Sequence, residues 1–168
     1  MRESIIGPVL KYGDNINTDI ISPPQYMELS IPEAAKYTMR PIDPNFSKKC
    51  RPGTVLVVGE NFGSGSSRET APLCLKQLGI QAIVAKSFAR IFYRNGINLG
   101  MCLLECKFTD SIYDYDRLQI NMEDGTIENL TSGETLLCRK LPDHITELIE
   151  DGGLIPHLKK TIKEKELS

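Results

Sequence analysis

The sequence has no long apolar run, no excess of charge of one sign and only two histidines. No run approaches the ~18 apolar residues that a membrane-spanning helix needs, so we expect no membrane segment. The chain has 20 Lys and Arg residues against 22 Asp and Glu residues, a formal net charge of −2. This balance argues against a general nucleic-acid binder. The N-terminus lacks the apolar stretch of a secretory signal, so we expect a cytoplasmic protein.

Cysteine and histidine are scarce. The five cysteines, at positions 50, 74, 102, 106 and 138, are too few and too scattered for a disulfide framework. If Cys102 and Cys106 share a strand, they lie roughly 13 Å apart along it and cannot share a metal ion. His144 and His157 both fall in the C-terminal third and form no recognisable ligand pattern. We therefore expect buried, reduced thiols that pack as small apolar groups, and no metal held by this chain alone.

The centre of the chain alternates apolar runs with helical patterns. Residues 54–58, 82–85 and 101–105 predict buried strands. Between them, apolar residues at helical spacing predict one helix ending near Gly79 and a second over residues 87–93. Because the connections are short, this order favours a parallel sheet flanked by helices.

The first third of the chain is irregular. Residues 5–10 predict a strand. Residues 31–39 predict a short helix with Ser30 as its N-cap.

The last third has a different period. From residue 117 onward, alternating apolar residues and the turn signals at 124–125 and 132–133 predict antiparallel hairpins. Two short helices entered at Pro142 and Pro156 follow, and then a frayed, charged tail. The predicted fold class is therefore α/β, a parallel βαβ core with an added antiparallel layer, in a single domain over residues 1–168.

The loop at residues 61–69 is the most informative segment. It lies at the carboxyl end of a predicted parallel strand, where α/β sheets bind ligands. Gly63 and Gly65 let the backbone approach a ligand, and the following helix supplies free N–H groups. Arg68 adds a partner for a carboxylate or phosphate. Anion binding is the expected chemistry of this loop.

A purely structural interpretation of the same loop stays open. Ser66 and Glu69 have the spacing of a capping box, which needs no function. In that case Pro72 would lose the hydrogen bond to the Arg68 carbonyl, whereas a helix starting two or three residues later would leave Ser66 and Ser67 free. The dinucleotide fingerprint, the P-loop and the hydrolase nucleophile elbow all fail to match.

Three motifs along the chain go beyond a generic pattern. They are Asn-Thr-Asp-Ile-Ile at residues 17–21, the 63–69 loop and the segment at residues 86–95. In this order and spacing they resemble the swivel domain of the aconitase superfamily, a swivelling β/β/α domain. The resemblance covers nearly the whole chain, and the length is similar to that of the separate small subunits of isopropylmalate dehydratases and homoaconitases.

The resemblance implies a hydro-lyase that interconverts 2-isopropylmalate and 3-isopropylmalate through dehydration and rehydration, in leucine biosynthesis. It implies that a separate large subunit holds a four-iron four-sulfur cluster, that this chain holds none, and that it is inactive alone. Ser66 matches the residue that removes the carbon-bound proton, and Arg68 matches a substrate-carboxylate arginine. Ser67, Thr18 and Asp19 match residues that line or support the site. An alcohol is a base only where N–H groups, a cation and exclusion of water stabilise its alkoxide.

Residues 24–30 correspond to the loop with which family members choose substrates. Where Glu28 falls, homoaconitase-like proteins usually carry an arginine and isopropylmalate enzymes an apolar residue. A glutamate would repel a third substrate carboxylate. Alternatively, Glu28 turns to solvent and Met27 or Leu29, next to Tyr26, meets the substrate. Both interpretations favour a small dicarboxylic acid with an apolar substituent; isopropylmalate leads, and citramalate, dimethylmalate and homoaconitate are alternatives.

The motif at residues 86–95 contains a lysine and two arginines, which could be mistaken for a nucleic-acid patch. We interpret it as structure or subunit interface, with Phe88, Ile91 and Phe92 in the core and the arginines on one face. Two rival functions remain: a stand-alone module that binds a carboxylate or phosphate through the 61–69 loop, and a structural or RNA-regulatory domain. The acidic balance of charge disfavours the second rival.

Overall fold

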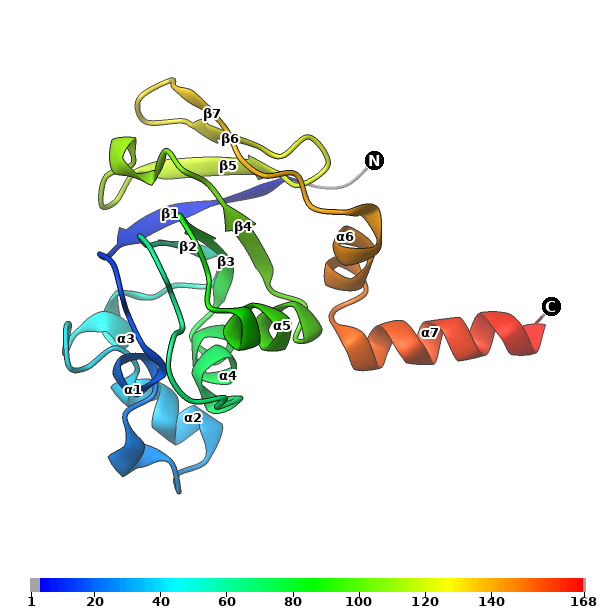
Figure 1. Ribbon diagram of the computed structural model, residues 1–168, viewed down its shortest axis with the longest axis horizontal. Helices are drawn as coiled ribbons and strands as arrows, with labels where there is room; N and C mark the ends of the chain where they lie inside the picture. The colour runs from blue at the N-terminus through cyan, green and yellow to red at the C-terminus, as the bar shows by residue number, and fades with distance from the viewer. Residues whose placement is uncertain (1–3, 168) are drawn as a thin grey trace.

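A mixed β-sheet organises the protein (Figure 1). The computed structural model describes residues 4–167, and within them seven strands follow the order β4-β3-β2-β1-β5-β6-β7. The strands are β1 (Ile5–Lys11), β2 (Thr54–Val57), β3 (Ile80–Ala85), β4 (Cys102–Glu105), β5 (Arg117–Asn121), β6 (Thr126–Asn129) and β7 (Thr135–Leu137).

Strand β1 joins two halves of this sheet. Its last residues pair in parallel with β2, with Val9 opposite Val55, and β3 and β4 continue the parallel half. Its first residues pair antiparallel with β5, with Ile5 opposite Ile120, and β6 and β7 continue the antiparallel half. The predicted α/β class, a parallel core with an antiparallel layer, is confirmed.

The two outer strands of the sheet, β4 and β7, meet at one end. Strand β4 is parallel to β1, whereas three successive antiparallel pairings separate β7 from β1, so β7 runs opposite to β4. Just after β7, the backbone N–H of Arg139 donates to the carbonyl oxygen of Glu105 at the end of β4, over 2.9 Å. The sheet is therefore curved enough for its two edges to share a hydrogen bond.

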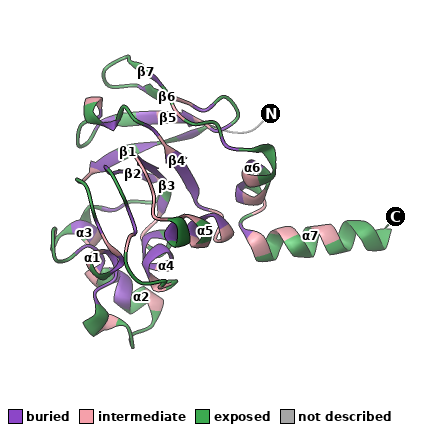
Figure 2. Ribbon diagram, in the orientation of Figure 1, coloured by how far each residue is buried: buried purple, intermediate pink, exposed green. Residues whose placement is uncertain are grey.

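Helices and 3-10 turns fill the connections. Helices α4 (Thr70–Gln77) and α5 (Arg90–Asn98) pack against β3 and β4, respectively. The N-terminal connection holds α1 (Thr18–Ile21), η1 (Pro24–Tyr26), α2 (Ile31–Ala34), η2 (Ala35–Tyr37) and α3 (Phe46–Lys49). A further turn, η3, covers Thr109–Ser111, and the chain continues through α6 (Asp143–Glu150) into α7 (Leu154–Leu167). Helix α7 projects from the body in Figure 1, and Figure 2 shows it without buried residues.

One hydrophobic cluster joins the two halves of the sheet. Val9, Leu56 and Ile83 of the parallel half and Ile120 and Ile127 of the antiparallel half are all fully buried and belong to it. Figure 2 shows this buried layer along the strands. In the part of the chain that the structure covers, no helix combines the length and apolar character needed to cross a bilayer.

The second central helix differs from its prediction. Residues 86–89 are extended along the 61–62 segment, with a bridge between Phe62 and Phe88 and a bond from the Ala89 N–H to the Phe62 carbonyl. Helix α5 therefore begins at Arg90, not at residue 87, and reaches Asn98. Phe88 precedes the helix, so the predicted core face is shifted. The prediction that Ile91 lies in the core is wrong, since it is 47% exposed, whereas the prediction for Phe92, which is 2% exposed, is confirmed.

Two other predicted helices also have different ends. The predicted 31–39 helix keeps its Ser30 cap, but the α-helix ends at Ala34 and a 3-10 turn continues it to Tyr37. The last helix begins at Leu154, before Pro156, because a proline in the first turn needs no N–H partner. It continues to Leu167, so the expected frayed tail is helical.

Candidate active site

The 61–69 loop is tied to the N-terminal segment by backbone hydrogen bonds. The N–H of Gly63 donates to the Ile16 carbonyl, and the N–H of Thr18 donates to the Ser64 carbonyl, each over 2.8 Å. Gly63 has a φ of +84°, and a Cβ at that position would clash with the Phe92 side chain. Only glycine has both the conformational freedom and the size for this position.

An aromatic cluster anchors the start of the loop. The rings of Phe62 and Phe92 meet edge to face, with centroids 5.1 Å apart and an interplanar angle of 89°. Phe88 contacts both rings. Because Phe62 and Phe92 are buried, they fix the backbone from which the polar part of the loop extends.

The first turn of α4 decides between the two interpretations of Ser66. The helix begins at Thr70 with Glu69 as its N-cap residue, and the cap has no side-chain hydrogen bond. Pro72 falls in the first turn, where its missing N–H costs nothing. The capping box is therefore not formed, and both Ser66 and Ser67 are exposed.

The structure brings the predicted residues of the loop and of α1 together. Thr18 Oγ1 and Ser66 Oγ lie 3.3 Å apart, and Arg68 Nη1 lies 3.0 Å from Asp19 Oδ1. Helix α1 is positioned for this by Asn17, whose side chain accepts a hydrogen bond from the Ile20 N–H. Two side-chain contacts, Thr18 to Ser66 and Asp19 to Arg68, thus join α1 to the loop. The fifth predicted residue, Ser67, lies in the loop between Ser66 and Arg68.

Several donors around Ser66 are unused. Arg68 Nη1 is buried, and although it contacts Asp19, it is not aligned for a hydrogen bond with any described residue. Gly65 and Ser67, on either side of Ser66, have no hydrogen-bond partner among residues 4–167. The loop itself, rather than the helix that starts farther on, therefore supplies the free N–H groups next to Ser66. A guanidinium and free amides around a hydroxyl suit a carboxylate ligand.

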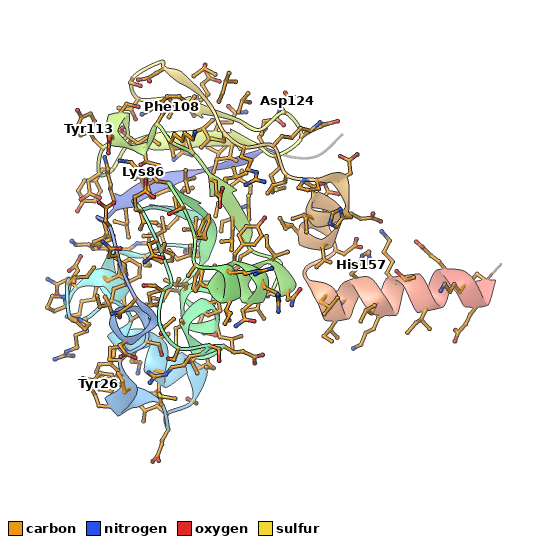
Figure 3. The ribbon with its side chains drawn as sticks, viewed as in Figure 1. Tyr26, Lys86, Phe108, Tyr113, Asp124 and His157 are labelled. Carbon is orange, nitrogen blue, oxygen red and sulfur yellow. The ribbon has the colours of Figure 1, made fainter. Side chains whose placement is uncertain are left out.

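The predicted specificity loop follows α1 directly. The ring of Tyr26, labelled in Figure 3, is occupied by packing. It stacks on the ring of Tyr37, with centroids 3.9 Å apart. Met27 and Leu29 are each 42% exposed, and Glu28 is exposed and has no ion-pair partner among the described residues. All three side chains are thus free to meet a ligand or a partner, and which one contacts substrate stays a prediction.

Comparisons with known proteins decide the family. Residues 16–109, which hold both halves of the site, match the aconitase C-terminal domain. The chain belongs to this family. It is 49% identical to an isopropylmalate/citramalate isomerase small subunit of Methanocaldococcus jannaschii, over 99% of this chain and 100% of that one. It is 45% identical to a 3-isopropylmalate dehydratase small subunit of Methanosarcina acetivorans, over 95% of this chain and 99% of that one.

The fold of this aconitase C-terminal domain agrees with a solved relative. A crystal structure of a 3-isopropylmalate dehydratase from Methanocaldococcus jannaschii superposes with a TM-score of 0.90 at 42% identity. The match covers 97% of this chain and 99% of that chain. The motif-based resemblance to the superfamily is thereby confirmed along nearly the whole sequence.

The aconitase family implies an iron–sulfur cluster, which cysteine thiolates hold. All five cysteines of this chain are free, and within residues 4–167 no three of them lie together. Cys106 and Cys138 share a side-chain hydrogen bond, a proximity that the sequence did not indicate. The cysteines of this chain therefore do not fit such a cluster.

One group of potential metal ligands was missed by the sequence analysis. Glu147, Asp151 and His157 lie within 4.8 Å of one another where α6 meets α7, near the His157 label in Figure 3. Asp151 already contacts His157 Nδ1 at 2.7 Å and Lys160 Nζ at 3.1 Å. Hydrogen bonds from His157 and Lys160 lower the pKa of Asp151. The Asp151 carboxylate is thus engaged by these two side chains of α7, and its contacts stay within the chain.

Two cavities of about 440 Å³ each lie away from the Ser66 loop. One is lined by Tyr93, Leu103, His144 and neighbouring residues. The other is lined by residues around Cys106 and Lys107. The site residues line neither cavity, so the open loop and not a closed pocket is the candidate active site.

Proposed function

We propose that this chain is the small subunit of a two-subunit hydro-lyase that interconverts 2-isopropylmalate and 3-isopropylmalate, a step of leucine biosynthesis. One observation carries the proposal: Ser66 is exposed, and two residues further on Arg68 has a buried guanidinium N–H with no aligned acceptor. The names of relatives at 45% and 49% identity support it.

Each residue of the site has its own role in the proposed reaction. Arg68 binds a substrate carboxylate through its unused N–H, and Asp19 holds the guanidinium in place. Ser66 Oγ takes the proton from the carbon next to the one that loses its hydroxyl, and it returns a proton when water adds back in the opposite orientation. Thr18 orients the Ser66 hydroxyl through the 3.3 Å contact. The free N–H groups of Gly65 and Ser67 stabilise negative charge as it develops near Ser66.

The site is incomplete in this chain alone. Ser66 and Ser67 are exposed, and in water a serine hydroxyl is too weak an acid to provide an alkoxide base. A partner large subunit that covers the loop would exclude water and strengthen every electrostatic contact there. We assign the four-iron four-sulfur cluster to that subunit, since the cysteines of this chain do not fit it. Arg90 and Arg94, exposed on α5, remain the predicted interface.

The segment after α1 is the proposed filter for substrates. Met27 and Leu29 offer apolar contacts to the isopropyl group, while the carboxylate of Glu28 repels a third substrate carboxylate. Citramalate, with a smaller methyl substituent, is the second candidate, because the Methanocaldococcus jannaschii relative is named for both activities. Five free cysteines fit a reducing compartment, and we place the enzyme in the cytoplasm, with no nucleic-acid partner.

The test is anaerobic reconstitution with the cognate large subunit, followed by hydration assays. The substrates are isopropylmaleate, citraconate, dimethylmaleate, cis-aconitate and homoaconitate. We expect turnover of isopropylmaleate and none of the tricarboxylates. Turnover of a tricarboxylate would reject the role of Glu28, and no turnover by an assembled complex would reject the hydro-lyase.

A serine pair separates catalysis from binding. Ser66→Ala should lower kcat ~1,000-fold with assembly intact, since general-base contributions are of this size. Ser64→Ala is the matched control, because Ser64 contributes only its backbone to the loop contacts. A stand-alone carboxylate-binding module predicts the opposite: the isolated chain binds isopropylmalate in calorimetry, and Ser66→Ala changes little.

A further inference from the structure

Two cysteines face each other where the edges of the sheet meet. The hydrogen bond from Arg139 to Glu105 pairs these two residues, and β7 runs antiparallel to β4. In an antiparallel ladder the next pair outward is then Cys106 opposite Cys138, with both side chains on one face. Cα atoms of such a pair lie roughly 4.5–5.5 Å apart, inside the range that a disulfide bridges.

The contacts of Cys106 agree with this register. Its Sγ lies 4.0 Å from the carbonyl oxygen of Leu137, the residue before Cys138. Its thiol also forms a hydrogen bond with the Cys138 thiol, and this bond lowers the pKa of Cys106 to about 7. Burial acts in the opposite direction, and a hydrogen bond from the Phe108 N–H lowers the pKa further. Burial raises the pKa values of Cys50 and Cys102 to about 12. Near neutral pH, Cys106 is thus the nucleophile among these three thiols.

A cavity gives small molecules access to Cys106. The residue is 2% exposed overall, but it lines a cavity of about 440 Å³ together with three cationic side chains, Lys86, Lys107 and Arg139. Lys86 and Phe108, labelled in Figure 3, both line this cavity. Asp110 pairs with Lys86 and Glu105 with Arg139, whereas Lys107 has no ion-pair partner among the described residues. A hydroperoxide is little larger than water, and the cationic lining favours the thiolate that reacts with it.

We infer that Cys106 and Cys138 form a peroxide-responsive dithiol whose disulfide joins the two edges of the sheet. This inference goes beyond the proposed hydro-lyase activity and does not depend on it. In the first step the Cys106 thiolate attacks a peroxide oxygen, the O–O bond breaks, and an alcohol or water leaves after taking a proton.

The second step closes the disulfide. The sulfenic acid on Cys106 is attacked by the Cys138 sulfur, the S–O bond breaks, and water leaves with the Cys138 proton. In sum, two thiols lose two electrons and two protons, and the hydroperoxide is reduced to an alcohol and water. The new bond ties the end of β4 to the segment after β7, so it restrains the whole antiparallel half.

The experiment uses the full chain, reduced and then exposed to hydrogen peroxide. We expect the loss of two hydrogen atoms in the intact mass, a peptide linking Cys106 to Cys138, and reversal by dithiothreitol. Because the bond closes a long loop, Tm of the oxidised chain should rise by roughly 8 °C. A linkage between other cysteines, or a chain that stays reduced while other proteins of similar cysteine content oxidise, would overturn the proposal.

Variants assign the two roles. Cys138→Ser should stop at the sulfenic acid, which dimedone traps on Cys106, and Cys50→Ser, the matched control, should still form the disulfide. Trapping on any other cysteine contradicts the assignment.

Where the variants do not fold, the wild-type chain still decides. Its alkylation by iodoacetamide should be fastest at Cys106, with a half-maximal rate near pH 7. The charged groups around the cavity that Cys106 lines are Lys86, Lys107, Arg139 and Glu105, with Asp110 paired to Lys86. A midpoint above about pH 8.5, the ordinary value for a thiol, contradicts the proposal.

Discussion

The loops of the parallel and antiparallel halves of the sheet differ in whether their backbone N–H groups have hydrogen-bond partners. In the parallel half, β2 ends in a loop where Gly65 and Ser67 have no partner within the described chain. In the antiparallel half, the hairpin turns close on themselves: the N–H of Gly133 donates to the Asn129 carbonyl over 2.7 Å, and that of Gly125 to the Asn121 carbonyl over 3.0 Å. Ligand chemistry therefore belongs where a loop leaves its own polar groups unsatisfied.

Matched glycines in the two halves give the sharpest contrast. Gly63 and Gly133 have nearly equal φ values, +84° and +82°, but an added Cβ meets Phe92 at Gly63 and nothing within 4 Å at Gly133. Gly63→Ala should lower the free energy of unfolding by ~3 kcal/mol and Gly133→Ala by ~1 kcal/mol. Urea denaturation measures both, and equal losses would show that packing under the loop does not matter.

The antiparallel half should affect stability without affecting catalysis. Asn129 is 1% exposed, donates to Asp116 Oδ2 over 2.9 Å, and accepts from the N–H groups of Thr131 and Ser132. Asn129→Ala leaves these groups unpaired and should cost ~2 kcal/mol of stability. With the assembled enzyme, kcat should stay within twofold of wild type. A large fall in kcat in a fully folded variant would show that the antiparallel half also affects catalysis.

In the parallel half, a substitution at the site should lower catalysis and leave stability nearly unchanged. Thr18→Val keeps the shape of a side chain that is 2% exposed and removes only its contact with Ser66 Oγ. We expect kcat to fall roughly fivefold, since a hydrogen bond that orients the base is worth about 1 kcal/mol. Thermal unfolding should change little. Unchanged steady-state kinetics would mean that Ser66 is oriented by another group.

The smallest expected effect lies in the connection between β1 and β2, and it depends on pH. Burial alone would raise the pKa of Asp43, but hydrogen bonds from Lys49 and Tyr12 outweigh it and lower the pKa below its usual 3.8. The carboxylate therefore stabilises the fold above pH 3.8, and this contribution is lost as pH falls through the lowered pKa.

Asp43→Asn should accordingly lower Tm at pH 7 by roughly 3 °C. At pH 2 the variant and the wild type should unfold at the same temperature. A difference that persists in acid would assign the effect to packing rather than to charge.

Local periodicity was enough to predict most of the sheet and its class. The alternation at Leu118 and Ile120 and the apolar run from Thr54 mark strands because burial on one or two faces leaves a direct trace in the sequence. The start of α5 was wrong because residues 86–89 are held by the distant Phe62 segment, a tertiary contact that no local pattern contains. Likewise, nothing local indicates that Cys106 and Cys138 are opposed.

For the candidate site, the sequence indicated the residues but not their burial or their contacts. The resemblance to the superfamily indicated Ser66, Arg68, Thr18 and Asp19. The proline at 72 correctly favoured a later helix start. The sequence did not indicate that Arg68 Nη1 is buried without an aligned acceptor, since that depends on where α1 places Asp19. Nor did it show that Tyr26 is occupied by stacking on Tyr37, because the two residues lie in separate 3-10 turns.

The dual pairing of β1 also constrains how the protein is made. This strand is synthesised before the other strands of the sheet, yet it lies at the centre of the sheet. Its Ile5 cannot pair until Ile120 has been synthesised. During synthesis, half of β1 therefore stays an unpaired edge until the hairpins emerge, open to pairing with other chains. Folding should be slow for a chain of this size, because its central contacts are also among its most distant in sequence.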